Sequence, residues 1–518
     1  MKKLSQKQKN WIEKTVSADR SYKKIVYTRF FLCALSVLLQ FFVYLLGVIW
    51  LGANWWVFNI VASFIGLLFV FHIFSRTERP SSKLSWVLLI VLFPIVGVSL
   101  YLAFGGGRPM KKLLKKINAA KERNARNADD FIKGVPQPSG GVGCLLEKCG
   151  FPAYSDGEVT YYPTGKEAFA EMLFEMKKAK KYILIEYFIV AGGKMWEQML
   201  AVLLEKAMQG VKIYILYDDF GSLLVLPPKY DKYLESLHEN IRCVAFNPVL
   251  PIFSARMNNR DHRKMLIVDG EAAFTGGINL ADEYIDEKVR FGYWKDSAIK
   301  VTGGGVNAFV IAFFNLYNAL KPEEDVSGFL TATNGEEGEG IIQPYDDIPG
   351  DKMLVAETVF LDLIDVAKEH LYITPPYLVL DDFMRSALCR AALRGVDVRI
   401  VTPGIPDKKI VYRLTRANYE ILMKEGVKIY EYTPGFIHAK NVVSDGAAVV
   451  GTVNFDYRSF YLHFENAVYF TKPEGVAAVK ADCEEIFSAS KLCTEQDIKR
   501  GFWGRLLDAN LRVFETLM

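Results

Sequence analysis

Two histidines of this chain open the same short pattern of residues, H-x-K-x4-D, and each copy is followed by G-[GT]-x-N. Because the chain holds six histidines in all, two such matches by chance would be roughly a one-in-a-few-thousand event. The pattern therefore indicates two related segments that carry chemistry. Its members are His262, Lys264, Asp269 and Asn279 in the first copy, and His438, Lys440, Asp445 and Asn454 in the second.

The spacing within each copy has a physical reason. Alternate residues of a strand point to one face, so each histidine projects together with its lysine. The apolar runs MLIV and NVVS then carry the chain to turns at Asp269-Gly270 and Asp445-Gly446, and the Gly-x-Asn after the next strand can return an amide to the same pocket. Two copies that face each other would form a compact cationic cleft without metal ligands in the usual sense. Such a cleft suits one phosphate group.

A phosphodiester needs a nucleophile, a proton for the leaving oxygen and positive charge on the remaining oxygens. One histidine can attack phosphorus to give a phosphohistidine, while the other protonates the leaving alkoxide and later deprotonates an acceptor alcohol. The two lysines and two asparagines would hold the phosphate oxygens. Asp269 and Asp445 lie far along the strand from their histidines, but across the interface between the two copies they can still orient the imidazoles.

The two motifs end two passes through one set of elements. The first pass reads KKYILIEYFIV, MWEQMLAVLLEKAMQG and VKIYILYDD, and the second reads EHLYITPPYLV, FMRSALCRAALRG and VDVRIVTP. Strand, helix and strand in this order form a parallel α/β unit. The sequence therefore predicts an α/β fold in which two similar lobes, residues 151–334 and 341–518, face each other across one active site. Their motif blocks are residues 257–284 and 433–460, and the acidic segment Gly335–Gly340 divides them.

Three apolar stretches precede the lobes, at residues 30–51, 55–74 and 84–104. The first two contain no charged side chain and run for 22 and 20 residues, and about 20 helical residues cross a bilayer core. They predict N-terminal transmembrane helices. Pro94 and Gly97 interrupt the third stretch, so we expect it to dip into the membrane and return, or to lie in the interface.

The net charge of +4 is unevenly distributed. Residues 1–126 carry 20 Lys and Arg against 4 Asp and Glu, while the remaining 392 residues carry 43 against 55. An acidic body argues against nucleic acid as the partner, and a basic front end suits an anionic membrane surface. By the positive-inside rule, the basic leader 1–29, the loop 76–83 and the segment Arg108–Arg126 are cytoplasmic. The chain is thus expected to be a multi-pass cell-membrane protein with a cytoplasmic catalytic body.

Two further segments have apolar residues at helical spacing. In the basic linker 105–150, RPMKKLLKKINAAK indicates an amphipathic helix that either lies on anionic lipid or is a solvated linker. The C-terminal FWGRLLDANLRVFETLM could dock on the body or lie on the bilayer, and the sequence favours neither. The seven cysteines show no CxxC motif and no Cys/His cluster with zinc spacing, so neither a disulfide framework nor a structural metal is expected.

At these residues the chain resembles the phospholipase D superfamily, whose members carry two HKD motifs, and within it the bacterial cardiolipin synthases. The resemblance covers nearly the whole chain beyond the basic leader. It is carried by SKLSWVLLIVLFPIVGVSLYLAFGGG, IEYFIV, LYDDFGS, HRKMLIVDG, GGINLADEY, YWKDSAIKVTG, ITPPYLV, RGVDVRIVTPG, FIHAKNVVSDG, GTVNFDYRSF and HFENAV. One departure is the three apolar stretches, where two spans are usual.

The resemblance implies that one phosphatidylglycerol transfers its phosphatidyl group to another, giving cardiolipin and glycerol without a metal or organic cofactor. It makes His262 the nucleophile and His438 the acid and base. Glu465, in HFENAV, joins Asn279 and Asn454 as a substrate-site residue and is a weaker candidate for supporting a histidine. The rival functions are a hydrolytic phospholipase D, transfer to another alcohol, a nucleic-acid phosphodiesterase and an inactive membrane scaffold.

Overall fold

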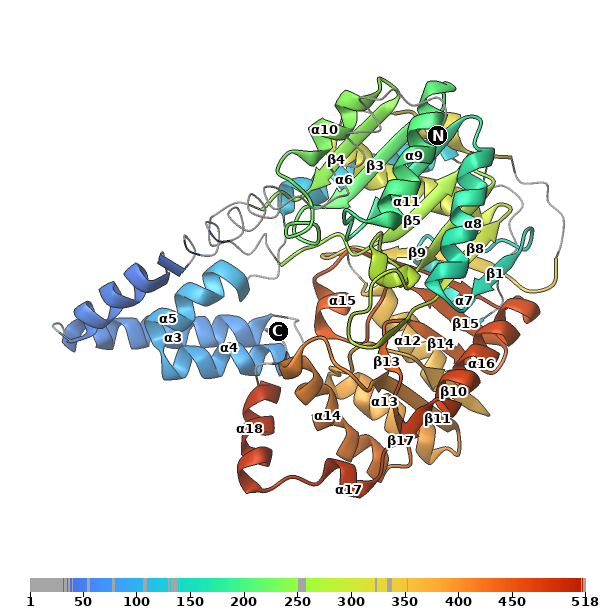
Figure 1. Ribbon diagram of the computed structural model, residues 1–518. Coiled ribbons are helices and arrows are strands. Elements are labelled where there is room, and N and C mark those ends of the chain that lie inside the picture. The colour runs from blue at the N-terminus through green and yellow to red at the C-terminus, as the bar shows by residue number, and fades with distance from the viewer. Residues whose placement is uncertain are drawn as a thin grey trace.

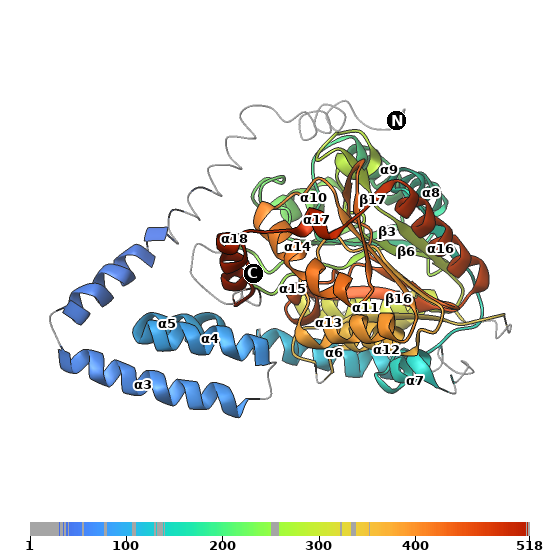
Figure 2. The same ribbon diagram turned by 90° about the horizontal axis from the view of Figure 1, so that it is seen from below.

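The computed structural model of the 518-residue chain is shown in Figures 1 and 2. The basic leader 1–29 and parts of the first apolar stretch lie outside the described residues. For residues 80–82 and 103–104 only the backbone is described. The described residues are 31, 35, 38–39, 41–53, 56–76, 80–105, 110–128, 131, 138, 140–249, 258–321, 324–332, 338–351, 353–513 and 515.

A group of apolar helices projects from the body (Figure 1). Among the described residues, α3 (Trp56–Ser75) is the one helix that is long and apolar enough to cross a membrane. The helical residues 41–53 form a shorter apolar helix. The prediction of several transmembrane helices is therefore supported for one helix and not confirmed for the others.

The third apolar stretch reverses direction in its middle. It forms α4 (Pro80–Leu92) and α5 (Pro94–Leu100), with the break at Phe93, and ends in a π-helical turn at Tyr101–Gly105. A β-carbon on Gly97 would lie 2.6 Å from the Cα of Ile90, so α5 folds back closely on α4. The backbone of the third apolar stretch thus turns back on itself, as Pro94 and Gly97 predicted.

The amphipathic helix of the linker is α6 (Lys111–Ala128), followed by α7 (Gly141–Lys148). The apolar side of α6 packs against α11 (Gly305–Leu320), where Ile117 is fully buried and Asn124 Nδ2 donates to Asn315 Oδ1 at 2.9 Å. The expectation that this helix lies on lipid is therefore wrong. An amphipathic pattern specifies an apolar partner, and here that partner is the protein body.

The first lobe is a seven-stranded sheet. Strands β2 (Tyr182–Tyr187), β3 (Lys212–Asp218) and β4 (Ile241–Phe246) are parallel, and the other pairs are antiparallel. Helices α8 (Gly165–Lys178), α9 (Lys194–Met208) and α10 (Tyr230–Leu237) pack on its outer face. In spatial order the strands are β1 (Val159–Tyr162), β8 (Ala298–Thr302), β6 (Ala272–Gly276), β5 (Lys264–Val268), β2 (Tyr182–Tyr187), β3 (Lys212–Asp218) and β4 (Ile241–Phe246).

The second lobe repeats this order and these directions, with one additional edge strand. Helices α12 (Val355–Val366), α13 (Asp382–Leu393) and α14 (Lys409–Lys424) pack on its outer face. The prediction of two similar α/β lobes is confirmed. The strands, listed from the additional edge strand, are β17 (Ser490–Leu492), β12 (Lys428–Tyr432), β11 (Asp397–Pro403), β10 (His370–Ile373), β14 (Asn441–Ser444), β15 (Ala447–Gly451), β16 (Glu465–Phe470) and β9 (Ile342–Asp347).

The two lobes share one hydrophobic core. It contains buried residues of both sheets together with α11 and α16 (Pro473–Ser488). A short two-stranded parallel sheet joins β7 (Tyr293–Lys295) of the first lobe to β13 (Gly435–Ile437) of the second. The remaining helices are α15 (Tyr457–Tyr461), α17 (Glu495–Ile498) and α18 (Phe502–Val513). The lobes are thus fixed relative to each other where the two motifs begin.

Candidate active site

Each motif histidine is held by the backbone of the opposite lobe. His262 donates its amide hydrogen to Phe464 O at 2.9 Å, and His438 donates its amide hydrogen to Lys295 O at 2.7 Å. These bonds continue the pairing of Asp261 with Phe464 and of β7 with β13. The two copies of the motif therefore start at one interface between the lobes.

The histidine side chains also reach across this interface. His262 Nδ1 lies 2.9 Å from Glu465 Oε2, and His438 Nδ1 lies 2.7 Å from Asp296 Oδ2. Both carboxylates are buried, and each belongs to the lobe opposite its histidine. A neutral imidazole that donates Nδ1–H to a carboxylate keeps its lone pair on Nε2. Each pair thus fixes a tautomer in which Nε2 can act as a base or a nucleophile.

The two motif lysines are buried beneath the histidines. Lys264 Nζ donates to His262 O at 2.7 Å, and Lys440 Nζ makes the equivalent bond to His438 O. Burial lowers the pKa of Lys264 to about 8 and that of Lys440 to about 7, although the charges of Glu465 and Asp296 oppose this shift. Each lysine is within electrostatic range of both carboxylates. Charged groups of both lobes therefore influence the pKa of each motif lysine.

The surroundings of both histidines favour the neutral imidazole. Burial and the positive charges of the lysines lower the pKa of His438 to about 4. They lower the pKa of His262 well below its ordinary value, and the charge of His438 contributes to that shift. The charge of His438 is among the causes that lower the pKa of His262, so the two imidazoles lie close enough to interact.

The motif aspartates do not contact the histidines. Asp269 accepts hydrogen bonds from the amides of Lys180, Lys181 and Tyr182 at 2.6–2.8 Å. Asp445 makes the equivalent bonds to the amides of residues 368–370 at 2.9–3.1 Å. The expectation that these aspartates orient the imidazoles is wrong. Each aspartate caps the start of the neighbouring strand, and Glu465 and Asp296 contact the histidines in its place.

The two motif asparagines are buried near the histidines. Asn279 Oδ1 accepts from the amide of Ile189 at 3.1 Å, and its Nδ2 donates to the Tyr284 hydroxyl at 2.7 Å. The ring of Tyr284 lies 5.6 Å from that of His438. Asn454 Oδ1 accepts no hydrogen bond from the part of the chain that the structure describes. Asn279 is therefore engaged in positioning Tyr284, and a direct contact of either amide with phosphate stays a prediction.

Sequence reasoning missed Asp296, although a signal for it exists. Asp296-Ser297-Ala298-Ile299 and Glu465-Asn466-Ala467-Val468 follow one pattern of acid, small polar residue, alanine and β-branched residue. The two segments begin the equivalent strands β8 and β16. Aligning the two passes beyond the asparagine would have placed Asp296 beside Glu465 as the second acid partner.

A third histidine, His463, also borders the site. Its ring centroid lies 5.5 Å from that of His262, and Arg458 Nε donates to its Nε2 at 3.4 Å. Within the described ranges, the ligand atoms of His262, His463 and Glu465 lie within 4.8 Å of one another, which is a possible arrangement for a metal ion. Glu465 already accepts from His262 Nδ1, so in this arrangement the carboxylate orients an imidazole.

Comparisons with known proteins match the segments that contain this site. A family model described as "Cardiolipin synthase, PLD-like domain" matches residues 172–290 and 360–488, and one described as "Phospholipase_D-nuclease N-terminal" matches residues 55–106. The first two ranges contain the two motifs, and the third contains α3, α4 and α5.

Relatives extend over most of the chain. It is 40% identical over 441 residues to an uncharacterized protein of Streptococcus mutans, covering 83% of this chain and 95% of that protein. It is 32% identical over 484 residues to a cardiolipin synthase of Alkalihalophilus pseudofirmus, covering 89% and 93%. The crystal structure of a phosphatidylserine synthase of Haemophilus influenzae has the same fold, with a TM-score of 0.56 and 14% identity, and covers 76% of this chain and 100% of its own. With both motifs, both lobes and the N-terminal helices matched, the chain belongs to the cardiolipin synthase family of phospholipase D-like proteins.

Proposed function

We propose that this chain transfers a phosphatidyl group from one phosphatidylglycerol molecule to another, giving cardiolipin and glycerol. The observation that carries the proposal is the pair of cross-lobe contacts, His262 with Glu465 and His438 with Asp296. They provide one nucleophile and one acid beside two buried lysines. Relatives named cardiolipin synthase supply the substrate class.

In the first step, Nε2 of His262 attacks phosphorus and the bond from phosphorus to the glycerol oxygen breaks. His438, protonated, gives its proton to that oxygen, so glycerol leaves as a neutral alcohol. Lys264 and Lys440 stabilise the charge on the phosphate oxygens. The negative charge of the bound phosphodiester raises the pKa of His438, so His438 takes up from solvent the proton that it gives to the leaving oxygen.

In the second step, His438 takes the proton from a hydroxyl of the second phosphatidylglycerol, and that oxygen attacks phosphorus. The bond from phosphorus to Nε2 breaks and restores His262. The same two histidines thus exchange roles between acid and base, and the reaction is reversible in principle. Glu465 and Asp296 are positioning residues, because they act on phosphorus only through the imidazoles.

The electrostatics favour His262 as the nucleophile. Burial and the charges of Lys264 and Lys440 lower the pKa of both histidines, and for His262 the charge of His438 adds to this lowering. Asp296 raises the pKa of His438 through its charge and hydrogen bond, and the pKa of Asp296 is lowered in return. An imidazole that gains a proton more readily is more often in the protonated form that a general acid needs. These directions support the roles that the family resemblance implied.

Exposed apolar side chains follow equivalent strands of the two lobes. Phe220 and Leu224 follow β3, and Ile405 and Ile410 follow the equivalent strand β11. Lys408, next to this second pair in the chain, contributes to the lowered pKa of His262, which places it near the imidazole. A pair of apolar rims at equivalent positions suits two acyl-bearing substrates. They support a lipid and not a nucleic acid as the substrate.

We further propose that the protein is a multi-pass membrane protein with its catalytic body in the cytoplasm. The support is α3 together with the excess of lysine and arginine in residues 1–126. Accessibility labelling of cysteines introduced near residues 52 and 115 in intact cells tests the orientation. Labelling of both sites from the same side contradicts it.

Replacing Gly277 with alanine is expected to disturb the site directly. A β-carbon there would lie 2.0 Å from Asp296 Oδ1 and 2.8 Å from His438 O. Overpacking of this kind costs about 1–3 kcal/mol of stability, and displacing Asp296 by about 1 Å should lower the transfer rate about a hundredfold. Gly446→Ala is the matched control, because a β-carbon on Gly446 meets nothing within 4 Å. Wild-type rate and thermal unfolding midpoint in Gly277→Ala would contradict this packing.

The rate should depend on the charge of the two lysines. The pKa values of Lys440 and Lys264 are lowered to about 7 and about 8, so they are charged below these values and neutral above them. Since kcat/KM reports the free enzyme, it already falls above the pKa of His438, which is about 4, and it should fall more steeply as the pH rises through the range of the two lysines. Lys440→Arg keeps its charge and should move the fall to higher pH. Profiles between about pH 5 and pH 10 for this variant and for Lys428→Arg, an exposed control, test the assignment. A fall at the same pH in the unmodified protein and in both variants would contradict it.

The product assay tests the proposed function as a whole. Purified full-length protein in mixed micelles with labelled phosphatidylglycerol should yield cardiolipin and glycerol. Phosphatidic acid as the main product would identify water as the acceptor and replace the proposal with a hydrolytic phospholipase D. If a different phospholipid formed only when another alcohol was added, that alcohol would replace phosphatidylglycerol as the acceptor in the proposal.

A further inference from the structure

The C-terminal helix α18 has its apolar side outward. Phe502 and Trp503 are 71% and 78% exposed, and Leu506 and Leu507 are about half exposed. On the opposite side Asp508 is buried, where Arg413 and Arg500 bind it at 2.6 and 2.7 Å. A helix docked on a soluble body buries its apolar side. This helix is instead attached through its polar side and leaves an apolar surface uncovered.

The helix lies at the base of the apolar N-terminal helices. Val513 O, at its end, accepts a hydrogen bond from Ser85 Oγ in the first turns of α4. Lys83, in the same turns, donates to Phe74 O at the end of α3. Figures 1 and 2 show α18 crosswise to α3 and α4, on the side of the body from which they project. If α3 crosses a membrane, a helix crosswise to it would lie in the plane of that membrane.

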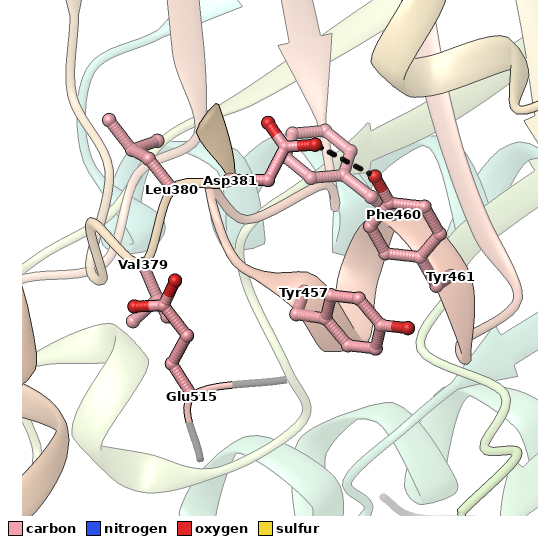
Figure 3. Close-up of a pocket in the computed structure, with 7 residues that line it drawn as sticks. All are labelled: Val379, Leu380, Asp381, Tyr457, Phe460, Tyr461 and Glu515. Carbon is pink, nitrogen blue, oxygen red and sulfur yellow. Dashed lines mark hydrogen bonds between the residues drawn. The ribbon is translucent and has the colours of Figure 1, made fainter. Parts of the chain in front are cut away.

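The chain is also fixed just after this helix. Figure 3 shows Glu515 in a small pocket with Val379, Leu380 and Asp381 and with the aromatic side chains of α15. Glu515 is 9% exposed there. The helix is therefore held at its middle, by Arg413 and Arg500 through Asp508, and just beyond its end, by the burial of Glu515, with its apolar side facing outward.

A cavity of about 480 Å³ lies behind the helix, between α14, α17 and α18. Its volume is in the range of ligand sites. The Nε atoms of Arg416 and Arg512 are buried and donate to no acceptor among the described residues. Six basic and three acidic side chains line it, an excess of three positive charges: Arg416, Lys424, Lys499, Arg500, Arg505 and Arg512 against Glu420, Glu495 and Asp508.

We propose that α18 lies in the membrane surface and that the cavity behind it binds the headgroup phosphate of an anionic phospholipid. The apolar side of α18 would enter the boundary of the acyl chains, as amphipathic surface helices do. The arginines and lysines behind it would meet the negative headgroups, to which basic residues near a membrane are attracted. This site contains none of the residues of the proposed reaction, so it is separate from the substrate site.

Quenching of Trp503 fluorescence tests the proposal on the full-length protein in nanodiscs. The lipids are brominated phosphatidylcholine with and without phosphatidylserine, an anionic lipid that is not the proposed substrate. Because the chain holds eight tryptophans, the contribution of Trp503 is the difference between the protein and its Trp503→Phe variant. We expect this contribution to be quenched, and more strongly when phosphatidylserine is present. Absence of quenching in both lipids overturns the proposal.

Charge variants test the headgroup site. Removing two cations, as in Lys499→Gln with Arg505→Gln, should weaken the effect of phosphatidylserine on quenching. The expected loss of affinity for phosphatidylserine is about fivefold for each residue replaced. Lys177→Gln with Lys181→Gln removes the same charge from exposed positions on the first lobe and should change nothing. An equal response in both double variants overturns the headgroup site. A further arm uses nanodiscs of phosphatidylcholine alone with added glycerol phosphate. The glycerol phosphate should not reproduce the effect of phosphatidylserine on quenching. An equal effect would assign the cavity to a soluble phosphate.

The measurement is independent of catalysis. In a His262→Asn background the proposed reaction is absent, and the quenching and its dependence on phosphatidylserine should stay as in the unmodified protein. Loss of quenching in that background would mean that binding at α18 depends on the catalytic site, and it would contradict the separation of the two sites. Failure of the cardiolipin assay, by contrast, would leave the predicted quenching unchanged.

Discussion

Replacing His262 with asparagine is expected to lower the rate of phosphatidyl transfer at least about a thousandfold. Asparagine keeps a polar group beside Glu465, but it has no nitrogen that can form a bond to phosphorus. Conversion of labelled phosphatidylglycerol to cardiolipin, followed by separation of the lipid products, measures the loss. The loss should be in kcat, because lysines that bind the phosphate stay in place.

A matched variant separates chemistry from folding. His238→Asn makes the same substitution beyond the end of α10, where His238 Nδ1 accepts from the Asn240 amide at 3.1 Å and contacts no residue of the site. It should keep the normal rate. Both variants should unfold near the temperature of the unmodified protein. A His262→Asn protein that is folded and retains a rate within about tenfold of normal would exclude His262 as the nucleophile.

Replacing His438 with asparagine should produce a loss that depends on the leaving group. With phosphatidylglycerol we expect at least about a hundredfold loss, since the alkoxide of glycerol needs a proton to leave and general acid catalysis contributes about 10²–10⁴-fold. With a nitrophenyl ester of phosphatidic acid, the leaving nitrophenolate needs no proton. Release of nitrophenolate in a single turnover should therefore be nearly normal.

The comparison of the two substrates decides the role of His438. Stopped-flow absorbance follows nitrophenolate, and the lipid assay follows glycerol release. Equal losses with both substrates would mean that His438 does not act as the acid. The same pair of substrates applied to His262→Asn should show large losses with both, because a nucleophile is needed whatever group leaves.

The sequence predicted the lobes and the histidines because local patterns encode them. Strand alternation places His262 with Lys264 on one face, and the second motif repeats this arrangement. A repeat of strand, helix and strand specifies parallel strands, and the structure has them in both sheets. Pro94 likewise predicted the reversal between α4 and α5, because a proline cannot continue the helix hydrogen bonds.

The acid partners of the histidines depend on how the lobes meet, which no local pattern encodes. Asp296 and His438 are 142 residues apart, and Glu465 and His262 are 203 residues apart. Asp269 looked suitable because it belongs to the motif. At about 3.3 Å for each strand residue, however, it lies up to about 23 Å along the chain from His262. Its place is therefore at the opposite end of the strand, where it binds amides.

The choice between lipid and protein as an apolar partner could not be made from helical periodicity either. The pattern of α6 and that of α18 both allow each partner. In the structure Ile117 of α6 is buried on the body, whereas Trp503 of α18 is exposed. The difference arises from which face each helix turns to the lobes, and this is set by tertiary contacts such as that of Asp508 with Arg413.

The central claim is that a phosphatidyl group is transferred through His262, and trapping this intermediate tests it most directly. His438→Asn lacks the base that activates an acceptor, so with the nitrophenyl substrate it should retain the phosphatidyl group after a single turnover. Mass spectrometry of the digested protein should find one acid-labile phosphatidyl group on the peptide that contains His262, and none in the protein that also carries His262→Asn. A phosphatidyl group on a different residue, or nitrophenolate release without any protein-bound phosphatidyl group, would contradict the account.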